Sequence, residues 1–218
     1  MKTTKIILSI INAVLFTLVL IFNIPIIISY GFILGTLIYY VLSDVREDKL
    51  INRSNIELQK IAYYDDLTGL PNRRFLSKKL DKNISQKTKF AALFLDFDGF
   101  KKINDTYGHN VGDLLLKYVS ERIIRIVKEH DTVYRIGGDE FVILLEKYKS
   151  KKQLENISNR IIEFVNKPYD INGVKVKIGI SIGICESKKC NDKEKIIDYA
   201  DKAMYLAKEQ GNKYCFAQ

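Results

Sequence analysis

The sequence predicts an α+β domain of the ferredoxin-like kind, preceded by an N-terminal hairpin of two transmembrane helices. Three observations lead to this prediction. Residues 6–43 contain no charged side chain, which sets the N-terminal part apart from the rest. Beyond residue 65, strands and amphipathic helices follow one another in the order strand, helix, strand, strand, helix, strand, which is typical of a mostly antiparallel sheet with helices on one face. The length of 218 residues gives room for one such domain plus an appendage.

The charge-free run is long enough for two membrane spans, because one helix needs only about 20 apolar residues to cross a bilayer. We expect one span over 6–22 and a second over 26–42. The break between them falls at Asn23-Ile24-Pro25, since proline removes a donor and disfavours helix at the residue before it. A cleaved signal peptide fits less well, because the run is too long and lacks an A-x-A site.

The basic residues around this run predict its orientation. Lys2 and Lys5 precede the first span, and Arg46 and Lys49 follow the second. By the positive-inside rule both ends lie in the cytoplasm. The sequence therefore predicts a multi-pass protein of the cytoplasmic membrane, with a membrane-embedded N-terminus and the downstream domain facing the cytoplasm.

A polar, helix-prone linker is expected over residues 44–64. Its apolar residues are spaced only loosely like heptads, so two interpretations stay open. One is a solvated linker helix, and the other is a short parallel coiled coil that would bring two copies of the downstream domain together.

The downstream domain, 65–218, begins with a turn-rich stretch that leads into a helix ending near Asn83. A buried strand, an amphipathic helix and a hairpin follow, and then a second helix and a long alternating strand that begins after Asn172-Gly173. A last helix and an edge strand close the chain. The expected ranges are strands 89–96, 132–136, 140–145, 174–184 and 214–216, and helices 112–128, 150–166 and 192–210.

Two acidic places stand out in this pattern. The first strand ends on Asp96-Phe97-Asp98, whose two carboxylates point to the same side of an extended chain. Asp98 also has an ordinary interpretation, as the N-cap of a helix that starts near Phe100. Alone, neither carboxylate identifies a site.

The second place is the hairpin turn Gly137-Gly138-Asp139-Glu140. The glycine pair predicts a tight turn with positive φ. Bare backbone beside carboxylates lets a phosphate approach while the acids hold a metal. A solvent-facing acidic hairpin is the competing interpretation for this stretch alone.

Composition excludes several classes of function. The net charge of +9 arises from scattered lysine patches such as 147–152, with no basic stripe interleaved with aromatics, so a nucleic-acid partner is not expected. Cys185, Cys190 and Cys215 form no C-x-x-C motif and have no histidine cluster nearby. Reduced thiols are therefore expected, and a zinc site is not.

Six separated motifs make the chain resemble the GGDEF-domain diguanylate cyclases from about Asp65 to the C-terminus. The resemblance implies a palm-type nucleotidyl cyclase fold for this part. The motifs, in order, are Asp65-Asp66-Leu67-Thr68-Gly69-Leu70 with Asn72-Arg73-Arg74, Asp96-Phe97-Asp98-Gly99-Phe100-Lys101, Asn104-Asp105-Thr106-Tyr107-Gly108-His109, Gly112-Asp113, Arg135 to Phe141, and Ala200 to Lys208.

The resemblance implies an enzyme that joins two GTP into cyclic di-GMP and pyrophosphate across a homodimer. Asp96, Asp139 and the Phe97 carbonyl carry over as metal ligands. These hard oxygen donors suit Mg²⁺ or Mn²⁺, with two ions per active site. Asp139 or Glu140 would help to deprotonate the attacking ribose hydroxyl, and Lys101 would contact the phosphates.

The remaining matched residues concern substrate binding. Asn104 and Asp113 carry over as guanine readers, and adenine would leave these groups unpaired. His109 is expected in the same pocket, although a lone histidine equally fits a packing role. The other expected substrate contacts are the backbone of Gly137 and Gly138 with the phosphates, and the ammonium of Lys208 with the β- and γ-phosphates.

Two departures from the family pattern bear on function. Asn212 stands where the family commonly has a phosphate-binding arginine. The stretch Lys128-Glu129-His130-Asp131 has lysine in place of the arginine of the family's product-inhibition motif. Because an ammonium is not a bidentate fork, we expect weak product inhibition.

Three alternatives to an active cyclase for GTP alone remain. The first is a catalytically inactive GGDEF domain that senses a nucleotide, and the second is a membrane-anchored interaction protein with a merely superficial acidic hairpin. The third is a cyclase that makes a different cyclic dinucleotide.

Overall fold

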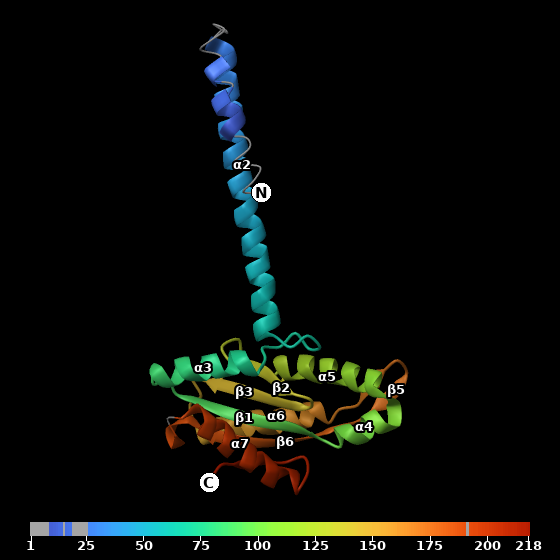
Figure 1. Ribbon diagram of the computed structural model, residues 1–218. Coiled ribbons are helices and arrows are strands. Elements are labelled where there is room, and N and C mark those ends of the chain that lie inside the picture. The colour runs from blue at the N-terminus through green and yellow to red at the C-terminus, as the bar shows by residue number, and fades with distance from the viewer. Residues whose placement is uncertain (1–8, 15, 19–25, 191) are drawn as a thin grey trace. The chain divides into compact units, whose positions relative to one another are not determined.

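The computed structural model describes residues 9–14, 16–18, 26–190 and 192–218 of the chain (Figure 1). These residues belong to two compact units, Met1–Gln59 and Lys60–Gln218, which are considered separately. The second unit carries every predicted site residue.

The first unit is dominated by one helix, α2 (Ile26–Tyr63), whose last turn belongs to the second unit. This helix runs without interruption through the predicted second span and the predicted linker. Residues 6–8, 15 and 19–22 of the first predicted span, 6–22, and its break at 23–25 lie outside the described residues.

The predicted multi-pass membrane location is contradicted, and a hairpin of two spans is not found among the residues that the structure describes. Within the described ranges, no helix carries an apolar stretch long enough to cross a bilayer.

The second unit is built on a five-stranded sheet with the order β2-β3-β1-β6-β7. The central strand β1 pairs antiparallel with β3 and β6, whereas β6 and β7 are parallel. The strands are β1 (Phe90–Asp98), β2 (Thr132–Gly137), β3 (Glu140–Glu146), β6 (Gly179–Glu186) and β7 (Tyr214–Phe216). The predicted mostly antiparallel α+β fold is confirmed.

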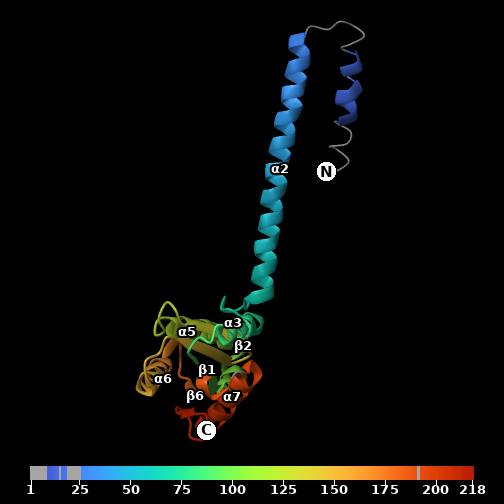
Figure 2. The same cartoon turned by 90° about the vertical axis from the view of Figure 1, so that its left-hand side faces the viewer.

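Helices cover both faces of the sheet, so the expectation of helices on one face is wrong. Alternate residues of β1 enter two separate apolar clusters, because successive strand side chains point to opposite faces. One cluster includes α5 (His109–Ile124) and α6 (Lys151–Val165), and the other includes α3 (Arg73–Ser85) and α7 (Lys193–Lys208). Figure 2 shows α5 and α6 on one side of the strands and α3 and α7 on the other.

The long strand expected over 174–184 is divided in two. β5 (Val174–Val176) pairs with β4 (Tyr169–Ile171) across the Asn172-Gly173 turn, where both residues have positive φ. β6 starts at Gly179 and pairs with β1. The chain breaks between β5 and β6 because the two parts hydrogen-bond to different partners.

Close packing fixes α7 on the sheet. A Cβ at Gly183 of β6 would lie 1.9 Å from the Ala200 carbonyl oxygen of α7, so only glycine permits this approach. This contact holds the helix that ends at Lys208 directly over β6.

Candidate active site

The β2–β3 turn lies at the end of the sheet where β1 also ends. Asp96 is paired in register with Glu140 on one side and with Ser181 on the other. The turn contains a register shift between Arg135 and Gly137. A bulge therefore shapes this hairpin and aims its acidic residues.

The prediction that the glycine pair adopts positive φ is wrong. The glycines with positive φ in the described chain do not include Gly137 or Gly138. The pair supplies room instead: both glycines are exposed, and no atom lies within 4 Å of a Cβ built at Gly138. The predicted close approach of a phosphate is compatible with this open surface.

Arg135 holds the turn from beneath. Its Nε and Nη2 donate to the Gly138 carbonyl at 3.0 and 2.8 Å, and its Nη1 donates to Asp65 Oδ1 at 2.8 Å. Asp65 Oδ1 also accepts from the backbone N–H and the hydroxyl of Thr68, at 2.8 and 2.6 Å. The side chain of Arg135 is only 11% exposed, so this arginine supports the turn and does not face a substrate.

Asp96 and Lys208 form an ion pair between the end of β1 and the end of α7. Burial raises the pKa of Asp96, and the charges of Asp139 and Asp98 add to this effect against the hydrogen bond from Lys208. Burial works against the charge of Lys208, but the hydrogen bond to Asp96 and the negative charges of Asp96, Asp139 and Asp98 together outweigh burial and raise the pKa of the ammonium. The site thus concentrates negative charge around one cation.

Glu140 faces a different neighbour. Arg73 Nη2 lies 3.8 Å from Glu140 Oε2, and Arg73 Nε donates to the Ile136 carbonyl at 3.2 Å. Burial raises the pKa of Glu140, with Arg73 opposing and Asp96 and Asp201 adding to the rise. Arg73 therefore bridges the two strands that flank the turn.

Asp98 does not cap α4 (Phe100–Tyr107), whose N-cap is Gly99. Its carboxylate accepts from the Ser181 hydroxyl at 2.8 Å and from the Asn212 N–H at 2.9 Å. Asn212 Oδ1 in turn accepts from the Ile180 N–H at 3.1 Å. We call Asp98, Ser181 and Asn212 the C-terminal latch, because they fasten the loop after α7 to the sheet.

The expected guanine readers lie on two helices in contact, α4 and α5. A Cβ at Gly112 would lie 1.9 Å from Asn104 Oδ1, so the glycine makes room for the amide. Asn104 Oδ1 is buried and has no hydrogen-bond partner in the described structure, which is an unfavourable state for an acceptor. Asp113 follows Gly112 and is exposed, as are Lys101 and His109.

The residues at the sheet end fit a divalent metal by their chemistry. Asp96, Asp139 and the Phe97 carbonyl are hard oxygen donors, and the mutual repulsion of the two carboxylates is what a cation would relieve. Within the described residues, no three His, Cys, Asp or Glu side chains gather around one point, but the expected set includes only two such side chains.

The predicted residues fall into two groups. Asp96, Asp139, Glu140 and Lys208 influence one another at the sheet end, whereas Asn104 and Asp113 belong to the α4–α5 pair. No side-chain hydrogen bond or ion pair joins Lys101 or His109 to the other predicted site residues among those the structure describes.

Sequence reasoning missed the supporting residues. Asp65, Arg135 and Asp98 lie in motifs but were given no supporting role, and Ser181 and Asn212 carry no local signal for theirs. The available sequence signal for the Asp65–Arg135 pair is that each residue stands next to a predicted turn.

A family model described as "Diguanylate cyclase, GGDEF domain" matches residues 62–214. The bifunctional diguanylate cyclase/cyclic di-GMP phosphodiesterase MucR of Pseudomonas aeruginosa is 43% identical over 170 residues, covering 75% of this chain and 25% of that protein. The chain thus spans about a quarter of the length of this relative.

Solved structures agree with the fold. The GGDEF domain of TpbB (YfiN) from Pseudomonas aeruginosa has a TM-score of 0.66 at 36% identity, covering 72% of this chain and 95% of that one. The coiled coil and GGDEF domain of DgcB from Caulobacter crescentus, in complex with c-di-GMP, has a TM-score of 0.76 at 25% identity, covering 84% of this chain and all of that one (100%).

Proposed function

The chain belongs to the diguanylate cyclase GGDEF domain family, and we propose that it condenses two GTP into cyclic di-GMP with release of pyrophosphate. The observation that carries this proposal is the sheet end, where the Asp96–Lys208 pair lies beside the open Gly137-Gly138 turn. The exposed backbone of the turn and the Lys208 ammonium would bind phosphate, and the carboxylates would bind a metal ion.

The proposed roles at the sheet end follow from charge. Asp96, Asp139 and the Phe97 carbonyl would hold Mg²⁺ or Mn²⁺, two ions per active site. Bound ions would supply activation of the attacking ribose hydroxyl and neutralise charge on the leaving phosphates. Asp139 or Glu140 would accept the hydroxyl proton.

Lysines and glycines would hold the triphosphate. Lys208 is already oriented by Asp96, and Lys101 is exposed on α4. Both ammonium groups suit the β- and γ-phosphates as point charges. The open backbone of Gly137 and Gly138 permits close contact with the phosphates.

The guanine would lie against α4 and α5. The unpartnered Asn104 Oδ1 would accept an N–H from the base, and the Asp113 carboxylate would accept the others. His109, at the start of α5, would line the same pocket. Adenine lacks these donors, so the pocket would favour GTP.

One active site holds one GTP in this proposal, so two copies must face each other. We therefore propose a homodimer, with the part of α2 over 44–64 either pairing as a coiled coil or serving as a linker.

The direct test is product analysis after incubation of the purified chain with GTP and Mg²⁺. Formation of cyclic di-GMP and pyrophosphate is expected. Incubation with ATP and GTP together distinguishes a cyclase that makes a mixed dinucleotide. Absence of any product, with GTP still bound, would overturn the enzymatic proposal.

That last outcome describes the second candidate, an inactive GGDEF domain that senses GTP. The observation favouring it is Asn212, which replaces an arginine and whose backbone and side chain are both engaged in the C-terminal latch. The neighbouring Lys213 would supply only a point charge in place of that arginine's bidentate contact.

A further inference from the structure

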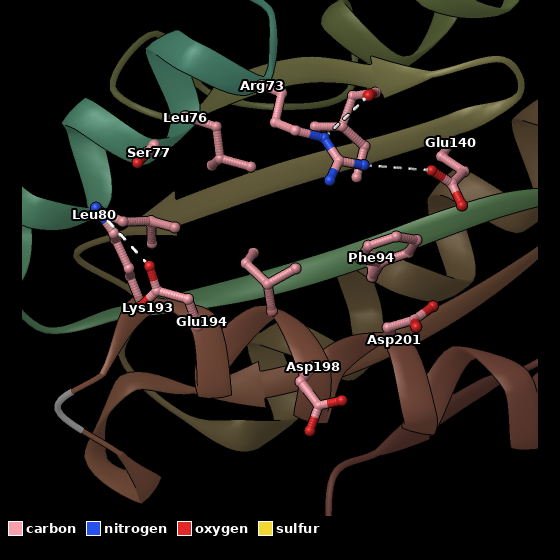
Figure 3. Close-up of a pocket in the computed structure, with 12 residues that line it drawn as sticks. Arg73, Leu76, Ser77, Leu80, Phe94, Glu140, Lys193, Glu194, Asp198 and Asp201 are labelled. Atoms are coloured by element: carbon pink, nitrogen blue, oxygen red, sulfur yellow. Dashed lines mark hydrogen bonds and ion pairs between the residues drawn. The ribbon is translucent and has the colours of Figure 1, made fainter.

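A cavity of about 460 Å³ lies between α3 and α7, above β1 and the hairpin (Figure 3). Its size falls in the range of small-molecule sites, roughly 300–1,000 Å³. Glu140 is the one predicted site residue among those that line it. Its apolar lining consists of Leu76, Leu80, Phe94, Ile136 and Ile197.

Acidic residues form one wall of this cavity. Glu194, Asp198 and Asp201 are spaced so that they share one face of α7. At 1.5 Å per residue this row extends over about 10 Å, with neighbouring carboxylates about 4.5–6 Å apart along the axis. Figure 3 shows Asp198 and Asp201 on α7, with Glu140 on β3 across from Asp201.

The cations on the rim are already paired. Lys193 Nζ lies 2.7 Å from Asp81 Oδ2 and 4.0 Å from Glu194 Oε1. Arg73 is held by Glu140 and by the Ile136 carbonyl. Neither side chain is free to balance the middle of the row.

The charge of the row is only partly balanced from outside. Lys202 Nζ lies 2.7 Å from Asp198 Oδ2, whereas Asp201 has no ion-pair partner in the described part of the chain. Burial raises the pKa of Asp201 and the neighbouring Asp198 raises it further, whereas the charge of Lys202 opposes the rise. The cavity thus combines an apolar floor with negative charge that the neighbouring cations balance only in part.

We propose that this cavity binds a linear aliphatic polyamine. The methylene segments would cover the apolar floor, and the ammonium groups would lie along Asp198 and Asp201. A propylene or butylene segment between two ammonium groups matches the spacing of carboxylates on one helix face.

Other ligand classes fit less well. An anion would meet the carboxylate row, and a neutral apolar molecule would remove water from it without replacing the lost hydrogen bonds. An inorganic cation would leave the apolar floor unused, and no three acidic side chains converge on one point in the described residues. A polyamine satisfies both surfaces.

The site would also affect the hairpin. Ile136 and Glu140 flank the Gly137-Gly138 turn and line the cavity, and Arg73 touches both. An ammonium near Glu140 would compete with Arg73 for this carboxylate. Occupancy is therefore expected to change cyclase turnover, a consequence that rests on the proposed function, whereas binding itself does not.

The test is calorimetric titration of the full chain with spermidine, without GTP. Saturable binding is expected for the wild type. The double variant Asp198→Asn/Asp201→Asn should bind at least about tenfold more weakly, since two charge contacts are lost. Ser77→Phe, which fills the cavity and leaves the carboxylates in place, should also weaken binding. Glu163→Gln, on exposed α6 surface over the opposite sheet face, should bind like the wild type.

Three results would overturn the proposal. These are no binding of spermidine to the wild type, equal binding by the double variant, and binding unaffected by Ser77→Phe, which would indicate a loose counter-ion. Titrations with Mg²⁺ and with 1,6-hexanediol complete the comparison, and either one matching spermidine would show that charge or apolar surface alone accounts for the heat. Because no arm uses GTP, the result is independent of cyclase activity.

Discussion

Asp139 is partly exposed in the β2–β3 turn, and it makes no hydrogen bond or ion pair within the described residues. Its removal should therefore leave the fold intact while depriving a metal of a ligand. We expect Asp139→Ala to lower cyclic di-GMP synthesis by at least about 100-fold, by analogy with loss of other electrostatic stabilisers. The free energy of unfolding should change by no more than about 0.5 kcal/mol.

Product chromatography and chemical denaturation measure the two quantities. Glu163→Ala, a loss of an exposed carboxylate on α6, is the matched control and should leave both unchanged. Synthesis by Asp139→Ala at the wild-type rate, with unaltered metal dependence, would remove Asp139 from the metal site.

Asp113 provides the test of base recognition. It is the fifth residue of α5, so it does not cap the helix, and it is exposed. Asp113→Ala should weaken GTP binding roughly ten- to a hundredfold, the usual effect of one lost base-reading contact. Stability should change by less than about 0.5 kcal/mol.

Titration of the variant with GTP and with ATP gives the affinity and the selectivity. Both should fall together if Asp113 reads guanine. Unchanged affinity for GTP would identify Asp113 as a surface residue of α5.

Asp65 makes stability depend on pH. Burial opposes its charged form, but hydrogen bonds from Thr68 and Arg135 outweigh burial and lower the pKa of Asp65 below its ordinary value. The charged carboxylate therefore stabilises the fold fully above the ordinary aspartate pKa of about 3.9, and this contribution is lost as pH falls through the lowered value. Wild type should exceed Asp65→Asn in stability by a constant amount near neutral pH, with the difference shrinking in acid.

Urea denaturation of both proteins across pH measures this difference. Asp66→Asn, at the exposed neighbouring position, controls for the change in net charge. A stability difference that grows as the pH falls would contradict the assigned role of the Arg135–Asp65 pair.

At the scale of elements, the end of α7 is positioned by the C-terminal latch. Lys208 closes the helix, and the loop behind it is fastened to β1 and β6 by Asp98 and Asn212. A Cβ at Gly179 would lie 2.7 Å from Asn212 Oδ1, so the strand also leaves room for the amide. Helix, loop and two strands together place the ammonium at Asp96.

Two substitutions of Asn212 separate its contributions. Asn212 has φ of +49°, which glycine tolerates and alanine does not. Asn212→Gly loses the hydrogen bond from Ile180 and should cost about 1 kcal/mol. Asn212→Ala adds the strain of the left-handed backbone and should cost about 1–2 kcal/mol more.

Denaturant unfolding ranks the variants, and the Michaelis constant for GTP reports the position of Lys208. Both variants should raise the Michaelis constant if the latch positions the lysine. Equal stability of the glycine and alanine variants would show that the loop relaxes and that the latch does not hold it.

At the scale of the whole domain, the predicted active site and the stretch matching the family's product-inhibition motif lie at opposite ends of β2. Asp131 directly precedes β2, at the opposite end of that strand from the Gly137-Gly138 turn. Its carboxylate is buried and accepts from the Glu146 N–H at 2.9 Å and the Lys128 N–H at 3.3 Å. Both oxygens of the Asp131 carboxylate are therefore hydrogen-bonded to the backbone of the domain.

We therefore expect weak product inhibition. Lys128, which stands where the family has arginine, is the residue whose substitution tests this expectation. Lys128→Arg should tighten inhibition by cyclic di-GMP roughly ten- to a hundredfold, because a guanidinium offers bidentate contacts to phosphate and guanine. Initial rates against added product measure the effect.

Lys128→Ala is the comparison variant and should leave inhibition as weak as in the wild type. Half-inhibition of the wild type at sub-micromolar product would show that the lysine already suffices.

Local interactions allowed the sequence alone to predict most elements and the acidic turn. The apolar alternation at residues 180, 182 and 184 and the Asn172-Gly173 turn both depend on neighbours along the chain. The structure confirms the strand and the turn. The spacing of the six motifs likewise predicted the family, which the comparison with known proteins confirms. Hairpins, helix faces and motif spacing depend on residues a few positions apart, and the sequence displays them directly.

The tertiary structure decided what distant residues do to one another. Arg135 supports its turn through an acid 70 positions away, and Asp98 finds partners 83 and 114 positions away. The helices divide between two faces of the sheet because two separate apolar clusters form, which no single stretch reveals. The cavity between α3 and α7 exists only after both helices pack on β1.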